Sequence, residues 1–381
     1  MALTNVFISP AGAGDNSGSS VANAVPAVDS NDWSDEIKAL DRNNKKFVFL
    51  SGTYTVGSKL TFSGAAPSRA EPNQWVGADS NGTLLKPKWD TTGLRLDLTD
   101  YPLIVNTANT ELVDTEETTY YRCLSFENTN TGYSKNCMID ATTADVDQQG
   151  WFGCNFKADC SHNNSEVMIV SSSNFNMCVF ESVGDAYDKI VDMRANGFLI
   201  NCRVIGPSTS GSGDGIGIES NSSSGTVFQT VITRVHGHGF FMNTTNNRNG
   251  PGVTNCTIVN VGGDGINTTS ISGDATETQT ARNGNSSIIF GCGAYGINVA
   301  ANDTRQAGGQ LAAMGSNSSG NFNNMDSYEN MIDVIAMTTG DFVDYANLDF
   351  RIKRSSGLYK HDGMTNLGAI QNEDYEFVSV S

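Results

Sequence analysis

The stretch WFGCNF at residues 151–156 returns as FNMCVF at 175–180 and as LINCRV at 199–204. The shared pattern is an apolar residue, two further residues, a cysteine, one residue and a second apolar residue. VFQTVI at 227–232 and VTNCTI at 253–258 follow the same pattern with threonine or cysteine in the fourth place, and IFGC at 289–292 matches its first half. A short apolar segment that recurs in this way predicts one structural unit per repeat.

The period of the repeat indicates a solenoid. The Cys/Thr positions 154, 178, 202, 230, 256 and 292 are separated by 24, 24, 28, 26 and 36 residues, which fits one circuit of a three-sided coil with loops of varying length. Strands of successive coils stack at about 4.8 Å, so these side chains would form an internal ladder. We therefore expect an all-β fold, a single-chain right-handed parallel β-helix of about ten coils. Its cysteines are expected to be reduced core residues and neither disulfides nor metal ligands.

A second ladder has the same period. It consists of GDGI at 213–216, GHGF at 237–240, GDGI at 263–266 and, more loosely, AYGI at 294–297. Glycine on both sides of a polar residue, directly before an apolar strand, predicts a tight turn that needs either a positive φ or a close approach of the backbone. Two ladders with one period fix the register of the expected coils.

Composition agrees with short strands joined by polar turns, since the chain has 40 Gly and only 17% charged residues. Trp33, Ile37 and Leu40 at helical spacing, with Ser34 placed to cap, predict a short amphipathic helix over the first coil. The expected organisation is an N-terminal segment with this capping helix (1–45), β-helix coils (46–300), a loop excursion with the last coils (301–345) and a C-terminal capping segment (346–381).

Charge and hydropathy restrict the partners. A net charge of −18 repels nucleic acid and anionic membrane surfaces, so a neutral glycan or a protein surface is expected instead. No window of 18 apolar residues occurs, and the N-terminus lacks the basic and apolar regions of a secretory signal. The sequence therefore predicts a soluble chain that is made in the cytoplasm.

Both ends of the chain resemble one known group of proteins. ISPAG at 8–12, DNSG at 15–18 and LSGTY at 50–54 are similar to the N-terminal segment of pectin-lyase-like right-handed β-helix proteins, and DFRI at 349–352 with SSG at 355–357 is similar to their C-terminal segment. The resemblance is strongest to bacteriophage virion and tailspike proteins of this kind. It implies the fold, whereas the superfamily includes lyases, hydrolases, tailspikes and inert virion components.

Asp214, His238 and Asp264 form the best candidate for a catalytic site, because stacking places the histidine between two carboxylates. Two coils separate these carboxylates, which gives roughly 9–10 Å, near the ~6.5–9.5 Å that suits an inverting glycosidase. The alternative is that all three are turn residues whose side chains bond one another and nearby backbone. A cation site at the two aspartates, with Ca²⁺ as the ion, is a further alternative, although it has few ligands.

The order of these residues also resembles polygalacturonase-type glycosidases. Asp214 with Glu219, followed by GHG at 237–239, is similar to their paired-aspartate and Gly-His-Gly motifs, and Asp188 or Asp192 would supply the earlier carboxylate. The sequence departs from the family where Gly precedes Asp214 and where GINT at 265–268 replaces the expected Arg-Ile-Lys. The letters RIK occur only at 351–353, in the C-terminal segment.

These features favour a structural or adhesive bacteriophage virion protein, such as a capsid decoration, fibre or tailspike-like subunit. It would act in the virion with other virion proteins and, by analogy, as a homotrimer, and would bind a cell-surface glycan without a cofactor. The alternative is a polysaccharide depolymerase, a glycoside hydrolase rather than a lyase, that uses the stacked carboxylates.

Overall fold

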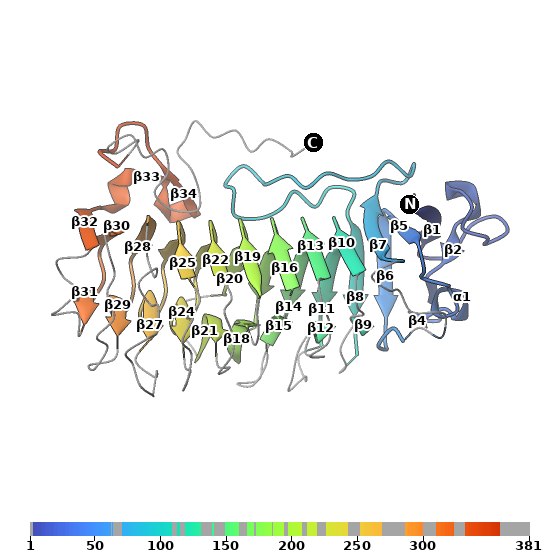
Figure 1. Ribbon diagram of the computed structural model, residues 1–381, viewed down its shortest axis with the longest axis horizontal. Helices are drawn as coiled ribbons and strands as arrows, with labels where there is room; N and C mark the ends of the chain where they lie inside the picture. The colour runs from blue at the N-terminus through green and yellow to red at the C-terminus, as the bar shows by residue number, and fades with distance from the viewer. Residues whose placement is uncertain are drawn as a thin grey trace.

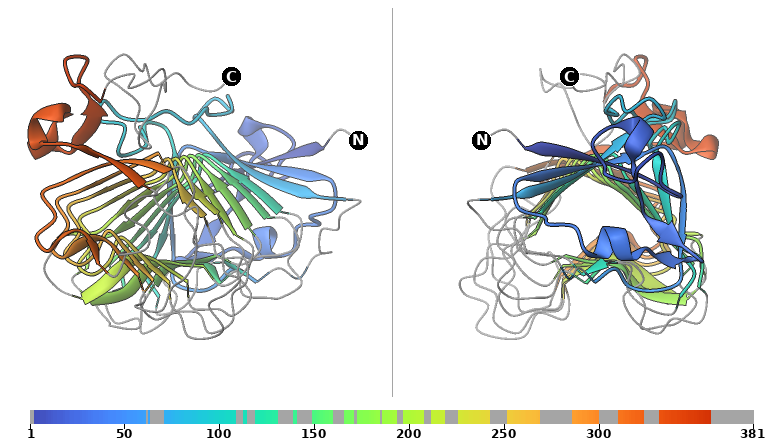
Figure 2. Two further views of the ribbon diagram at one scale, coloured as in Figure 1. Left: turned by 60° about the vertical axis from the view of Figure 1, so that its left-hand side comes forward. Right: turned by 90° about the vertical axis from the view of Figure 1, so that its right-hand side faces the viewer.

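The computed structural model shows a right-handed parallel β-helix whose coils follow one another along a single axis (Figure 1). It describes residues 3–61, 63, 71–108, 113–114, 119–130, 139–140, 149–159, 166–170, 173–184, 186–193, 197–207, 212–218, 226–242, 252–268, 286–299, 310–323 and 332–358. Seen nearly along the axis, the coils have a three-sided outline (Figure 2). The predicted fold class is confirmed.

Three parallel sheets form the sides of the helix, and among the described residues they hold ten, eleven and nine strands, in line with about ten coils. Sheet one contains β2 (Val25–Pro26), β1 (Thr4–Ser9), β5 (Lys45–Leu50), β7 (Asn73–Ala78), β10 (Thr119–Arg122), β13 (Gln149–Phe152), β16 (Ser173–Asn176), β19 (Phe198–Ile200), β22 (Thr226–Phe228) and β25 (Gly252–Thr254). Sheet two contains β6 (Gly52–Val56), β8 (Pro102–Asn106), β11 (Ser125–Asn128), β14 (Asn155–Ala158), β17 (Val179–Ser182), β20 (Arg203–Ile205), β23 (Val231–Thr233), β26 (Thr257–Val259), β28 (Ser287–Phe290), β30 (Gln310–Gly315) and β32 (Ile332–Ala336). Sheet three contains β9 (Val113–Asp114), β12 (Ile139–Asp140), β15 (Glu166–Val170), β18 (Ala186–Met193), β21 (Ser212–Ile218), β24 (Phe240–Met242), β27 (Ile266–Thr268), β29 (Tyr295–Val299) and β31 (Gly320–Asn323).

The core lies inside the coils and is built from stacked columns of like side chains. Tyr121 and Trp151 stack at 3.7 Å between ring centroids, and Trp151 and Phe175 at 5.6 Å. A parallel column on sheet two stacks Phe156 on Phe180 at 5.2 Å. Because the same template position of each coil points inward, in-register pairing alone produces these stacks.

The cysteine ladder occupies the corner between sheets one and two. The thiol of Cys202 donates to the carbonyl of Phe175, one coil earlier, at 3.5 Å, and Cys256 donates in the same way to Val227 at 3.5 Å. Thr230 replaces cysteine because its hydroxyl makes the corresponding bond to Leu199, also at 3.5 Å. The six described cysteines are buried and free, as predicted.

The ladder departs from the prediction at its C-terminal end. Ile289 pairs with Ile258 and not with Val253, so Ser287 is the residue at the ladder position, where its hydroxyl accepts the amide N–H of Cys256 at 3.0 Å. Cys292 lies at the next corner, between sheets two and three. The assignment of Cys292 to the ladder was therefore wrong, because the half-template IFGC matched one strand too late.

The buried thiols make stability depend on alkaline pH. Burial raises the pKa of Cys256 from its ordinary value of 9.0 to about 12, so the folded state keeps the thiol protonated while the unfolded chain ionises. This contribution to stability is complete below pH 9 and is lost as the pH rises toward 12, at up to about 1.4 kcal/mol per pH unit for each such thiol. Urea unfolding midpoints at pH 8 and pH 10 should show the loss. Cys256→Thr, which copies Thr230, should reduce it; an equal loss in the variant would contradict this assignment.

The N-terminal helix is present but shorter than predicted. It spans α1 (Asp35–Lys38), and the hydroxyl of Ser34 caps it by accepting the amide N–H of Ile37 at 3.1 Å. Ile37 is buried in the main core, and Trp33 lies before the helix in β4 (Asp32–Trp33), which pairs antiparallel with β3 (Val28–Asp29). Short 3₁₀ turns occur at Val21–Asn23, Thr339–Asp341 and Tyr345–Asn347.

A long connection between β7 and β8, residues 79–101 and here called the strap, runs outside the coils along sheet two (Figure 1). It contacts four successive coils. The Leu85 carbonyl accepts the thiol of Cys123 at 3.4 Å, the Tyr101 hydroxyl donates to Gly153 at 3.1 Å, and Arg95 forms an ion pair with Glu181 at 2.6 Å. On the fourth coil, the guanidinium of Arg203 lies 4.2 Å from the ring centroid of Trp89.

The strap and the C-terminal segment together cover the outer face of sheet two. Strands β33 (Phe342–Asp344) and β34 (Asp349–Ile352) form an antiparallel hairpin that packs on this face, where the rings of Phe342 and Phe290 lie 5.4 Å apart. The covered side chains form one apolar cluster outside the coils, to which Trp89, Val179, Val231, Val259 and Phe350 belong. The described part of the segment predicted as a C-terminal cap therefore packs against the side of the helix.

Residues 310–323 continue the coils through β30 and β31, and β30 pairs with β28 and β32. The step from Ile289 to Met314 and the step from Tyr295 to Gly320 are both 25 residues, so the coils keep their ordinary period within the segment 301–345. Within the described ranges, no helix is both long and apolar enough to cross a bilayer.

Candidate functional site

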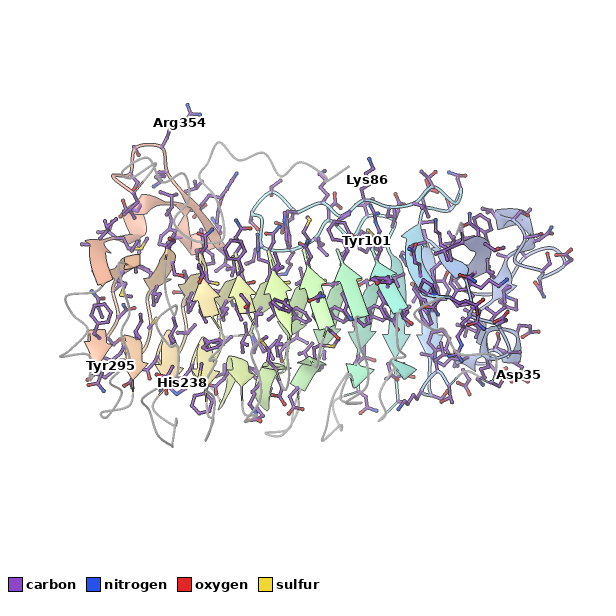
Figure 3. All side chains as sticks on the ribbon, viewed as in Figure 1. Asp35, Lys86, Tyr101, His238, Tyr295 and Arg354 are labelled. Atoms are coloured by element: carbon purple, nitrogen blue, oxygen red, sulfur yellow. The ribbon has the colours of Figure 1, made fainter. Side chains whose placement is uncertain are left out.

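The polar ladder lies where each chain turn enters sheet three. Ile216 pairs with Phe240, Phe240 with Ile266, and Ile266 with Ile297. The residues two positions earlier, Asp214, His238, Asp264 and Tyr295, consequently stack in the predicted order, one per coil. Figure 3 shows His238 and Tyr295 along the same side of the helix, at strands β24 and β29.

The first three side chains of the ladder each accept the backbone amide of the following ladder residue. Asp214 Oδ1 accepts the N–H of His238 at 2.7 Å, His238 Nδ1 accepts the N–H of Asp264 at 3.0 Å, and Asp264 Oδ1 accepts the N–H of Tyr295 at 2.8 Å. The ladder is a continuous chain of side-chain-to-backbone hydrogen bonds. This geometry has the form expected of turn residues that bond along a stack.

Several positions of the ladder require glycine because the backbone there lies very close to atoms of the next coil. A Cβ on Gly239 would lie 2.5 Å from Ile258 Cγ2 and 2.7 Å from the carbonyl oxygen of Gly265, and Gly265 meets the carbonyl of Gly296 at 2.6 Å in the same way. Among the first glycines of each motif, Gly213 has a positive φ of 116°. The close approach of the backbone and the positive φ, which the sequence predicted as alternatives, therefore both occur, at different glycines.

His238 is held by its ring nitrogens and by an aromatic neighbour. Its Nδ1 accepts the amide N–H of Asp264 at 3.0 Å, and its Nε2 lies 3.3 Å from the side-chain nitrogen of Asn267. The ring stacks on Phe241 at 5.5 Å between centroids, and 28% of the side chain is exposed. The His238 side chain is thus fixed in place and partly exposed to solvent.

Asp264 is buried and its two oxygens accept three hydrogen bonds. Besides the Tyr295 amide, the side-chain amides of Asn267 and Asn298 donate to Oδ2 at 2.6 and 3.0 Å, and Asn323 donates onward to Asn298 at 3.0 Å. This row of asparagines was not predicted. Its signal is an asparagine after the apolar residue in INT at 266–268, INV at 297–299 and FNN at 322–324.

Asp214 has a different environment. It is partly exposed, and burial raises the pKa of its carboxyl above the ordinary 3.8, against the lowering effect of the His238 amide. Lys189 pairs with Asp214 in the sheet and makes an ion pair with Asp188. The two ladder carboxylates therefore lie in different environments: Asp264 is buried among N–H donors, whereas Asp214 is partly exposed and has a raised pKa.

The other residues named from the sequence do not join the ladder. Asp192 is buried in β18, Arg351 bonds Asp349 within the C-terminal hairpin, and Glu219 lies outside the described residues. In the described part of the chain, no group of three or more His, Cys, Asp or Glu side chains is arranged to hold a metal ion. Asp264 does not fit Ca²⁺, since its oxygens already face N–H donors.

The two carboxylates should respond oppositely to substitution. The raised pKa of Asp214 means that its contribution to stability is complete below about pH 4 and is lost as the pH rises through its folded value. Asp214→Asn should therefore be as stable as the wild type at pH 3.5 and equally or more stable at pH 7.

Asp264→Ala leaves three donors without an acceptor and should lower the free energy of unfolding by about 2–4 kcal/mol. Denaturant melts at both pH values test this, and a destabilised Asp214→Asn at pH 7 would contradict it.

Comparison with known proteins identifies a solved structure with the same fold. No protein-family model and no curated protein matches the sequence. Among solved structures, the chain is similar to pectate lyase Pel9A, with 13% identity, a TM-score of 0.51 and coverage of 97% of this chain and 96% of that one. The chain has the pectin-lyase-like β-helix fold.

Two further solved structures align with lower TM-scores. ORF18 of Geobacillus virus E2 aligns with 13% identity and a TM-score of 0.33, over 78% of this chain and 54% of that one. A variant of the periplasmic alginate epimerase AlgG aligns with 11% identity and a TM-score of 0.29, over 77% of each chain. At 13% identity, the likeness to pectate lyase Pel9A establishes the fold alone.

Proposed function

We propose that the chain is a structural and adhesive subunit of a bacteriophage particle, which binds a cell-surface glycan and does not cut it. It would assemble with other virion proteins and with itself as a homotrimer. The pectin-lyase-like fold suits this role, because stacked coils give a stiff body with long, regular outer faces.

The hydrogen bonds of the ladder are the main support for the proposal that the chain does not cut glycans. Asp214, His238 and Asp264 are the residues that a depolymerase would need, and each of them accepts a backbone amide of the next coil. Asp264 is in addition buried beneath two asparagine side chains. A carboxylate enclosed in this way neither reaches a sugar nor activates a water, since a general base must lie within hydrogen-bond reach of the proton it takes.

The test combines binding and cleavage on one panel of polysaccharides. Wild-type protein and an Asp214→Asn, Asp264→Asn double variant are assayed for glycan binding and for release of reducing ends. We expect both proteins to bind the same glycan and neither to release reducing ends. Cleavage by the wild type that the variant loses would overturn the proposal, and sedimentation equilibrium should give three times the mass of one chain.

One observation favours a depolymerase as the second candidate. The raised pKa of Asp214 and the exposed edge of His238, stacked on Phe241, are features of a carboxylic acid beside a sugar-facing ring. In this case Asp214 would protonate the leaving oxygen of a glycoside. Activity would then fall as the pH rises above the pKa of Asp214, and Asp214→Asn would abolish it without loss of stability.

A further inference from the structure

The outer face of sheet one carries a column of side chains that is distinct from the polar ladder. Register places Gln74, Tyr120, Gly150, Asn174, Phe198 and Thr226 on successive strands in one line parallel to the helix axis. Their sequence neighbours Tyr121, Trp151, Phe175 and Leu199 point inward and are buried. The column therefore faces outward, on the side that Figure 1 turns toward the reader.

Two aromatic rings of this column are exposed. Tyr120 is 41% and Phe198 38% exposed, and the exposed Asn174 lies between them. They are three strands apart, so the rings are separated by about 14 Å along the axis. Gly150 makes room for the first ring, because a Cβ there would lie 2.7 Å from Tyr120 Cδ1. The Tyr120 ring thus leans along the axis over the next coil.

The described residues of this column include no acidic side chain, although the chain as a whole has a net charge of −18. The adjacent column on the same strands consists of Val76, Arg122, Phe152, Asn176, Ile200 and Phe228. On these two columns the side chains are aromatic, aliphatic, amide or hydroxyl, with Arg122 as the single ion. Aromatic rings that alternate with amides match the apolar faces and hydroxyl groups of a sugar.

We propose that this face binds a neutral polysaccharide chain that lies along the helix axis. Tyr120 and Phe198 would stack against pyranose rings, and Asn174 would bond the hydroxyls of the sugars between them. The inference rests on the glycan binding proposed above and assigns that binding to sheet one, away from the ladder on sheet three. A second copy of the chain fits the face less well, because Asn174 and Asn176 separate the apolar side chains near Tyr120 from those near Phe198.

Affinity electrophoresis in gels that contain neutral polysaccharides such as dextran, glucomannan or xyloglucan tests the assignment, with alginate as the acidic counterpart. We expect the wild type to be retarded by a neutral glycan, and a Tyr120→Ala, Phe198→Ala double variant to bind it about ten-fold more weakly or worse. Both side chains are exposed, so thermal melts should show the variant folded. Val183→Ala, which removes an exposed apolar side chain elsewhere, is the matched control and should bind like the wild type.

Two more variants separate loss of stacking from other effects. Phe198→Tyr keeps a ring and should keep binding, whereas Gly150→Ala keeps both rings but displaces that of Tyr120 and should weaken binding. If the wild type binds a neutral glycan and the double variant binds equally well, glycan binding stands and its placement on sheet one is wrong. Retardation by alginate alone, or by no glycan, would overturn the inference, as would a change of oligomeric state in the double variant, which would make the face a subunit contact.

Discussion

Gly239→Val is expected to abolish the soluble folded protein, and Gly239→Ala to lower the free energy of unfolding by about 2–3 kcal/mol. The Cβ of either residue would overlap Ile258 and the carbonyl of Gly265 at 2.5 and 2.7 Å. Neither group can move independently, because both belong to the next coil and that coil is fixed by the one beyond it. The inserted methyl group must therefore separate two coils, and it breaks the hydrogen bond that His238 accepts. Urea unfolding monitored by tryptophan fluorescence measures the effect.

Gly357→Ala is the matched control for this substitution. Apart from its chain neighbours, no atom of the described residues lies within 4 Å of the position that its Cβ would take, so we expect a change of less than about 0.5 kcal/mol. If Gly239→Ala were as mild as this control, the close approach of the coils at the ladder would not be what requires glycine.

Trp89→Ala is expected to cost about 3–5 kcal/mol and to free the strap from the coils. The indole is buried in the outer apolar cluster and lies against the guanidinium of Arg203, whose Nε donates to the carbonyl of Gly93 at 2.7 Å. Without the ring, a buried cation loses the group that shields it, and the strap loses its contact with the most distant coil. Trypsin should then cut the native variant after Lys88 or Arg95.

Leu98→Ala provides the comparison within the same segment. Leu98 belongs to the strap but is 39% exposed, so its removal should change neither the unfolding midpoint nor the tryptic pattern. Equal resistance of Trp89→Ala and the wild type to trypsin would show that the strap is held by its other contacts, such as the Arg95–Glu181 ion pair.

The coils were predictable because their register depends on local repetition. The cysteine template placed Cys154, Cys178, Cys202 and Cys256 correctly, and GDGI and GHGF placed Asp214, His238 and Asp264 on successive coils. The template failed at Cys292 because an apolar residue three positions before a cysteine is a weak signal. It fits a strand of sheet two as well as one of sheet one.

The outer cover of sheet two was missed because it depends on contacts between segments far apart in the sequence. Trp89 and Phe350 meet this face from opposite ends of the chain. A signal exists in the strands themselves, since VIT at 231–233, TIV at 257–259 and SIIF at 287–290 lack polar alternation and are buried throughout. Strands that are apolar on both sides indicate a sheet covered on both faces.

The sequence predicted only part of the chemistry of the candidate site. The order of Asp214, His238 and Asp264 follows from spacing, but the atoms that each side chain bonds do not. Whether a stacked carboxylate faces a neighbouring side chain, a backbone amide or solvent depends on a rotation of its side chain, which spacing does not determine. The hydrogen bonds to the amides of the next coil and the asparagines around Asp264 therefore emerge only from the three-dimensional arrangement.

The ladder has a consequence for how long such a molecule can become. Each link joins a side chain to a backbone amide, and every coil offers that amide whatever residue carries it, as the successive recipients His238, Asp264 and Tyr295 show. An inserted coil would meet the same backbone amide in its neighbour as any other coil does. After a deletion, the two coils brought together would also meet in this way. The body can therefore gain or lose length in whole rungs without matched changes in its neighbours, so its reach can vary between related chains while its cross-section stays the same.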